Sequence, residues 1–160
     1  MVESIPAQLT QDTAGLFSNK TRDRILASSL VLFNDRGFGA VTTASIARHA
    51  GVLEGSLWYH FNTKKDILDA HIDVLERVFL QENLDAGSAD PDTIIAGIFR
   101  AYDVIWDFRY ILRDDFHPHL EAEGPVLKKT LAINAFLDEW TEGRILHSLE
   151  HGLLLSLMHI

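Results

Sequence analysis

The 160-residue chain contains no cysteine, and this absence excludes several kinds of site at once. The chain can form no disulfide, offers no thiolate nucleophile and provides no cysteine ligand for zinc. Long apolar runs are also missing, because the longest, around residues 153–158, is far shorter than the about 20 residues that span a bilayer. Residues 1–19 lack the basic start and apolar centre of a secretory signal. We therefore expect a cytoplasmic protein that does not contact a membrane.

Positive charge is scarce over most of the chain and concentrated in one segment. The net charge is −9, and residues 66–160 hold seven basic and 18 acidic residues. Residues 18–65, in contrast, hold seven basic and three acidic residues, a net charge of +4. A basic segment joined to an acidic remainder indicates that only one part of the molecule binds a polyanion.

Apolar residues recur with helical spacing along the chain, and no segment shows the alternation of a strand. The sequence therefore predicts an all-α fold. Thr21 and Thr42 are the expected N-caps of the first two helices, and Thr63 with Asp66 forms a predicted capping box at the start of a long helix. The expected helices cover residues 21–36, 43–49, a short segment through 57–61, 63 onward, 94–113, 126–141 and a final apolar segment from 145.

Two short helices joined by Ala50-Gly51-Val52, and preceded by an amphipathic helix, have the dimensions of a helix-turn-helix unit. Gly51 can take the positive φ that a tight turn requires. A helix enters the DNA major groove only when its outer face is small, polar and not strongly acidic. The segment after Gly51 has such a face, with Leu57 and Phe61 on the side that packs inward.

The run from Thr21 to Leu68 resembles the DNA-binding domain of the tetracycline-repressor (TetR) family over about 48 consecutive positions. The shared positions are Arg36-Gly37-Phe38, Thr42-Thr43, Ile46-Ala47, Ala50-Gly51-Val52, Gly55, Leu57, Tyr59-His60-Phe61 and Lys64. Residues 1–19, which show no sustained periodicity, are expected to form a flexible arm. The resemblance implies a helix-turn-helix domain over 20–66 and a helical effector-binding and dimerisation domain over 67–160. It further implies a homodimeric transcriptional regulator, a repressor that binds a palindromic operator, with no enzymatic activity and no cofactor.

Carried over by position, the resemblance assigns phosphate contacts to the start of the second helix and base or groove contacts to the third. The implied DNA-binding residues are Thr42, Thr43, Arg48, Glu54, Gly55, Ser56, Trp58, Tyr59, His60 and Lys64. Two positions depart from the family pattern. Leu53 stands where a small capping residue is usual, and Ser45 replaces an acidic residue, so we expect the second helix to lack a full capping box.

The same resemblance implies a cavity between the C-terminal helices that binds a lipophilic or aromatic effector. The candidate lining residues are His71, Leu75, Phe99, Tyr102, Asp103, Trp106, Tyr110, Phe136 and Trp140, although aromatic residues at helical spacing are more often simply core. The histidines that invite a metal assignment are His117, His119, His147 and His151. No carboxylate is fixed beside them by the sequence, so we predict no metal site.

Two other functional classes stay open at this point. One is an interaction module that keeps the helix-turn-helix fold without binding DNA, and Leu53 with Glu54 gives that alternative some support. The other is a metal-dependent helical enzyme, which lacks a nucleophile elbow, a His-Glu-x-x-His run and a phosphate loop. Because the final apolar segment stops at Ile160, we expect either a short member of the family or a shortened chain.

Overall fold

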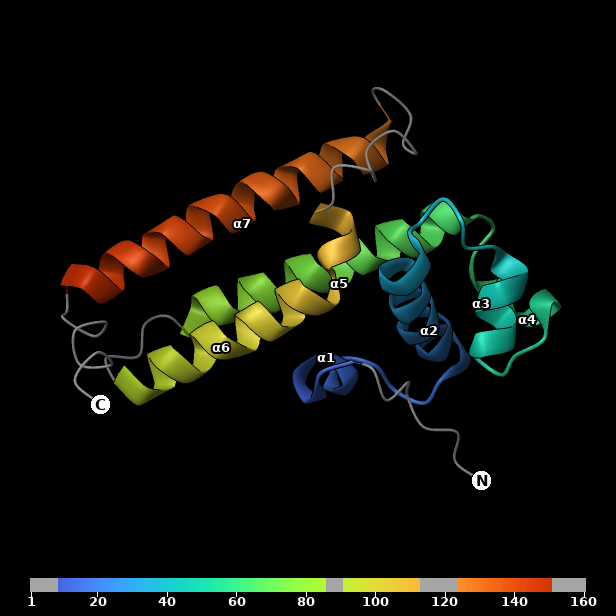
Figure 1. The fold of residues 1–160 in the computed structure, drawn as a ribbon, viewed down its shortest axis with the longest axis horizontal. Helices are drawn as coiled ribbons and strands as arrows, with labels where there is room; N and C mark the ends of the chain where they lie inside the picture. The colour runs from blue at the N-terminus through green and yellow to red at the C-terminus, as the bar shows by residue number, and fades with distance from the viewer. Residues whose placement is uncertain (1–8, 86–90, 113–123, 151–160) are drawn as a thin grey trace.

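A computed structural model describes residues 9–85, 91–112 and 124–150, and in these ranges the chain forms helices and no strand. The all-α prediction is therefore confirmed. Figure 1 shows a small helical unit at one end and long helices at the other. In chain order the elements are α1 (Gln11–Gly15), α2 (Thr21–Arg36), α3 (Thr43–His49), α4 (Glu54–His60), α5 (Lys64–Asp85), α6 (Pro91–Asp107), the 3-10 helix η1 (Arg109–Leu112) and α7 (Pro125–Glu150).

Helices α2, α3 and α4 pack together into the small unit, which we call the head (Figure 1). The apolar spacing of α2 places Ile25, Leu26 and Phe33 in its core, all essentially inaccessible to solvent. Ile46 from α3 and Leu57 from α4 meet them there, also fully buried. Helices of seven residues are too short to be stable alone, so α3 and α4 depend on this shared core.

Helix α5 leaves the head and runs between α6 and α7, and with them it forms the body of the molecule (Figure 1). Its predicted inward stripe is confirmed, because Ile67, Leu68, Ile72, Leu75 and Phe79 are buried. The first turns of α5 pack against α2, while its later turns pack against α6 and α7. One continuous helix therefore connects the head to the body.

The chain before the head is folded where the structure describes it, although the sequence predicted a loose arm. Thr10 caps α1 by accepting a hydrogen bond from the Thr13 backbone N–H, at 3.3 Å. Thr13 and Phe17 are buried, and α1 packs on α6. Thr10 also donates its backbone N–H and its hydroxyl to the carboxylate of Asp107, at 2.8 and 2.7 Å. The arm was mispredicted because these partners lie 97 residues away.

Four other predictions about helix ends need correction. Thr21 is the first residue of α2 and not its cap, since Lys20 occupies the cap position and makes no side-chain hydrogen bond there. α3 has a full capping box, because the Ser45 hydroxyl accepts from the Thr42 N–H while the Thr42 hydroxyl accepts from the Ser45 N–H, both at 3.2 Å. α6 ends at Asp107 and passes into η1, whereas α7 continues through the break predicted near residue 142.

The capping box predicted at the start of α5 is present. The Thr63 N–H donates to the Asp66 carboxylate at 3.0 Å, and the Asp66 N–H donates to the Thr63 hydroxyl at 3.2 Å. Over the ranges described, no helix is both long and apolar enough to cross a membrane.

Candidate nucleic-acid interface

Helix α4 exposes one face and buries the other. Leu57 is fully buried and Phe61, which ends the helix, is 3% exposed, so both anchor α4 to the head. Tyr59 is 86% exposed and Trp58 is 44% exposed, which is unusual for large aromatic side chains. Leu53, at the cap position, is 80% exposed and makes no capping hydrogen bond. These exposed side chains, with Glu54, Gly55 and Ser56, form what we call the α4 face.

The start of α3 adds hydroxyl groups near this unit. Thr42 is exposed and Thr43 half-buried, and Arg48 is exposed in the last turn of α3. The capping box uses the Thr42 oxygen only as an acceptor, so its hydroxyl hydrogen stays available to an external acceptor such as a phosphate oxygen. The Ser45 hydroxyl, in contrast, is committed, because it donates to the Thr42 carbonyl at 2.7 Å.

The turn between α3 and α4 is fixed by two features. Gly51 has a φ of +63°, a left-handed conformation that costs other residues about 1–2 kcal/mol. Arg24 reaches over from α2 and donates from Nη2 to the carbonyls of Ala50 and Gly51, at 2.5 and 3.2 Å. The guanidinium therefore holds the angle between the two short helices, a role that sequence reasoning missed. The signal available in the sequence was a basic residue in the helix that precedes the turn.

Lys64 is engaged within the head, although the sequence predicted that it contacts a DNA phosphate. Its Nζ donates to the carbonyls of Phe38 and Val41 at 2.5 and 2.9 Å and lies 3.5 Å from that of Gly39. The same ammonium group sits 4.4 Å from the centre of the Phe38 ring. Partial burial lowers the pKa of Lys64. The side chain thus ties the start of α5 to the loop that leads into Thr42.

The remaining predicted contacts lie in or beside the two short helices. His60 is half-buried at the end of α4, and its ring meets the Tyr59 ring edge-on, with centroids 5.1 Å apart. The structure therefore gathers nine of the ten predicted DNA-binding residues on α3, α4 and their caps, and it places Lys64 beside the loop before α3.

Behind the head, a set of buried hydrogen bonds joins α2 to α5 and η1, which we call the polar seam. His71 donates from Nε2 to the Leu26 carbonyl at 3.0 Å, because a carbonyl can only accept. Its Nδ1 therefore accepts the Tyr110 hydroxyl hydrogen at 2.7 Å. Asn34 extends the seam by accepting from the Tyr110 N–H at 3.1 Å and donating to the Asp107 carbonyl at 2.6 Å.

Burial has strong electrostatic consequences in the polar seam. It lowers the pKa of His71 from 6.5 to about 4; the hydrogen bond to Leu26 opposes this shift, and the positive charge of Arg22 adds to it. Burial also raises the pKa of the Tyr110 hydroxyl well above its usual range. Both groups are therefore neutral near pH 7, as their hydrogen bonds require.

Comparison with known proteins points to the same family as the resemblance seen in the sequence. The profile described as bacterial regulatory proteins, tetR family, matches residues 25–71. The HTH-type transcriptional repressor KstR2 of Mycolicibacterium smegmatis is 36% identical over 83 residues, which are 50% of this chain and 40% of that protein. Within residues 25–71, this chain matches the TetR family. The family profile begins within α2 and ends within α5, so the match covers most of the head and the first turns of the connecting helix.

Solved structures are similar to this chain over the body as well as the head. The probable transcriptional regulatory protein RHA5900 is 26% identical, with a TM-score of 0.60 over 82% of this chain and 72% of that one. The ketosteroid transcriptional regulator KstR2 of Mycobacterium tuberculosis has a TM-score of 0.57 at 23% identity, over 84% and 71% respectively, and shows the shared fold. Both of these proteins are named as transcriptional regulators.

The residues expected to line an effector cavity do not surround one common space. Phe99, Tyr102 and Trp106 lie on the surface of α6, with exposed fractions of 64%, 47% and 64%, and Asp103 is exposed beside them. His71 and Tyr110 bond to each other in the polar seam, and Leu75 is core. The helical spacing of an aromatic stripe is the same whether the stripe faces inward or outward, so periodicity could not tell these cases apart.

Phe136 does line a space, a groove of about 280 Å³ between α5 and α7 that it shares with Glu76, Ala132 and Ile133. The side chain of Trp140 lies outside the described residues, as do His117, His119 and His151 and the side chain of His147. Within the described part of the chain, no three histidine, aspartate or glutamate side chains gather in a way that could hold a metal ion.

Proposed function

We propose that this chain is a DNA-binding transcriptional regulator, a ligand-responsive repressor that binds a palindromic operator as a homodimer. The observation that carries the proposal is the α4 face. It consists of exposed aromatic, apolar and small polar side chains on a helix that two buried residues hold rigidly to the head. Such a face suits the major groove, where apolar groups contact thymine methyls and hydroxyls contact base edges.

The distribution of charge along the chain supports an orientation in which the head faces the DNA. The segment that holds the head has a net charge of +4 in a chain whose total is −9. The positive end would therefore face the phosphates, while the acidic body would be repelled from them. Thr42, Thr43 and Arg48 lie at the two ends of α3, where they would contact the DNA backbone. Glu54, in the first turn of α4, has cytosine N4 as its natural partner.

The same proposal divides the chain into two domains. Residues 20–66 form the DNA-binding domain, and residues 67–160 form the effector-binding and dimerisation domain. The matched segment of the curated M. smegmatis repressor covers only 40% of that protein, so its activity comes to this chain as a proposal. A repressor that binds two half-sites needs heads about 34–36 Å apart. An effector bound in the body would favour conformations in which the two heads have a different spacing. Helix α5 would transmit this change, because it packs on both the head and the body.

The decisive experiment is selection of binding sites from a random-sequence duplex library by the purified chain. We expect a palindromic site, and we expect the logarithm of the binding constant to fall linearly with the logarithm of the salt concentration. The alternative of an interaction module without DNA binding predicts no enriched sequence. Enrichment of a non-palindromic site would contradict the proposed homodimer.

A further inference from the structure

The groove between α5 and α7 has an apolar floor and a small volume. Ile133, which lines the groove, is 4% exposed, and Phe136 packs edge-on against the buried Phe79 with ring centroids 5.9 Å apart. The volume of about 280 Å³ lies just below the range of about 300–1,000 Å³ for ligand pockets. The groove therefore fits a compact molecule with an apolar part.

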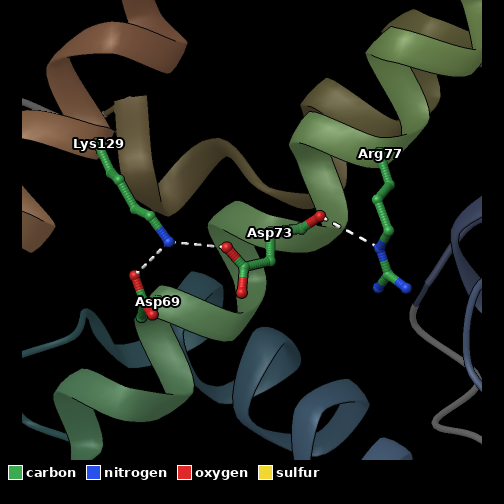
Figure 2. A network of polar contacts seen from close by, with 4 residues as sticks. All are labelled: Asp69, Asp73, Arg77 and Lys129. Atoms are coloured by element: carbon green, nitrogen blue, oxygen red, sulfur yellow. Dashed lines mark hydrogen bonds and ion pairs between the residues drawn. The ribbon is translucent and has the colours of Figure 1, made fainter.

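Glu76 lines the groove and belongs to an acidic surface of α5, which we call the acidic wall and which continues beside the groove toward the head. Asp69, Asp73 and Glu76 are spaced four and three residues apart, so they share one face of the helix. Figure 2 shows Lys129 reaching from α7 to the first two of them, with Nζ at 2.9 Å from Asp69 and 2.8 Å from Asp73. The single positive charge of Lys129 balances only one of the two aspartates, so this surface stays negative even without the charge of Glu76.

In the part of the chain that the structure describes, Lys129 gives the acidic wall its ion pairs, and Arg77 adds none. Arg77 points away from α7 in Figure 2, and its Nε donates to the Asp73 carbonyl at 3.2 Å. Lys129 donates hydrogen bonds to Asp73 and Asp69, and these bonds raise the pKa of Lys129 above its usual value, so its single charge is already committed to this pair. Among the described residues, the structure gives the Glu76 carboxylate no hydrogen bond and no ion pair, although Glu76 lines the groove.

We infer that this groove binds a compact lipophilic cation. Its positive group pairs with the Glu76 carboxylate, and its apolar part packs on Ile133 and Phe136. An aromatic ring beside a carboxylate attracts an organic cation through both the ring quadrupole and direct charge. An anion of the same shape is disfavoured by the negative wall. The inference deepens the proposed function, because it names the chemical class of the effector.

The test is calorimetric titration of the whole chain, without DNA, with three probes of similar shape and different charge. Benzyltrimethylammonium is the cation, benzyl alcohol the neutral probe and phenylacetate the anion. We expect the cation to bind about tenfold more tightly than the alcohol, and phenylacetate to bind most weakly. Glu76→Gln should remove most of the cation's advantage and leave the alcohol unaffected. Ala132→Leu, which adds bulk in the groove, should weaken both.

The matched control is Glu142→Gln, which removes an exposed carboxylate of α7 outside the groove lining and should change nothing. Equal binding of cation and alcohol, equal effects of the two glutamine variants, or no binding of any probe would overturn the inference. The last result, together with light scattering that shows a dimer, would mean that a second copy covers the groove. A chain that selects no DNA site but binds the cation through Glu76 would refute the proposed function and leave this inference standing.

Discussion

Replacement of Lys64 by methionine separates two roles for a basic residue at this position of the head. A phosphate contact would make Lys64 part of the DNA interface. The structure instead shows its ammonium group on the carbonyls of Phe38 and Val41, at 2.5 and 2.9 Å. We therefore expect Lys64→Met to destabilise the fold and to disturb DNA binding indirectly, by loosening the loop that leads into Thr42.

The magnitude follows from these two short hydrogen bonds. Each charge-assisted bond contributes about 1.5–3 kcal/mol when buried, and partial exposure of Lys64 reduces each to about 1 kcal/mol. A loss of about 2 kcal/mol in the free energy of unfolding corresponds to a fall of roughly 4–8 °C in Tm for a chain of this size. DNA affinity should fall by the same factor for all sequences, while its dependence on salt concentration stays unchanged.

The assays are thermal unfolding and fluorescence anisotropy with a labelled duplex over a series of salt concentrations. Lys20→Met is the matched control, because it removes an exposed charge from the head and should leave Tm within about 2 °C of the unaltered chain. A phosphate contact by Lys64 would instead lower the magnitude of the logarithmic salt slope by about 0.9 and leave Tm unchanged. That pair of results would refute the positioning role.

Three further predictions concern the head and the polar seam. An added Cβ at Gly55 meets no atom within 4 Å, so Gly55→Ala should stabilise the chain by about 0.5–1 kcal/mol and yet weaken DNA binding. The control is Gly143→Ala on α7, where an added Cβ is equally free of contacts. It should stabilise the chain and leave DNA affinity unchanged. Because the folded state disfavours protonation of His71, the free energy of unfolding should fall by about 3 kcal/mol as the pH drops from 6.5 to about 4. Urea unfolding at several pH values measures this fall. In the His71→Asn variant, the free energy of unfolding should lose this part of its dependence on pH. Ser56→Ala and Tyr59→Ala should change the preferred site in a repeated duplex selection, and an unaltered preference in both variants would argue against base contacts by α4.

Most of the helices could be predicted from the sequence, because apolar spacing and caps act locally. α3 begins at Thr43 after its Thr42 cap as predicted, and the inward faces of α4 and α5 follow the predicted positions. The capping box of α3 was missed because a serine hydroxyl at position 45 can replace the usual carboxylate. α7 continues past the predicted break since Gly143 is tolerated in a helix interior, at a cost of about 1 kcal/mol.

The candidate site was harder to predict where it depends on contacts between distant segments. The sequence shows that Lys64 is basic and begins a helix, but its carbonyl partners lie 23–26 residues earlier in the chain. Arg24 holds a turn that lies 26 and 27 residues away. The α4 face, in contrast, was predictable, because burial of Leu57 and Phe61 at helical spacing fixes which neighbouring side chains point outward.

The most direct test of the account is a map of amide chemical-shift changes when the isotopically labelled chain is titrated with its selected duplex. If α4 and the start of α3 read DNA, the largest changes fall within residues 42–48 and 53–60, and amides of α6 and α7 stay nearly unchanged apart from a uniform broadening. Large changes centred on the exposed aromatic side chains of α6, with those two segments unaffected, would contradict the assignment of the head as the DNA-binding unit.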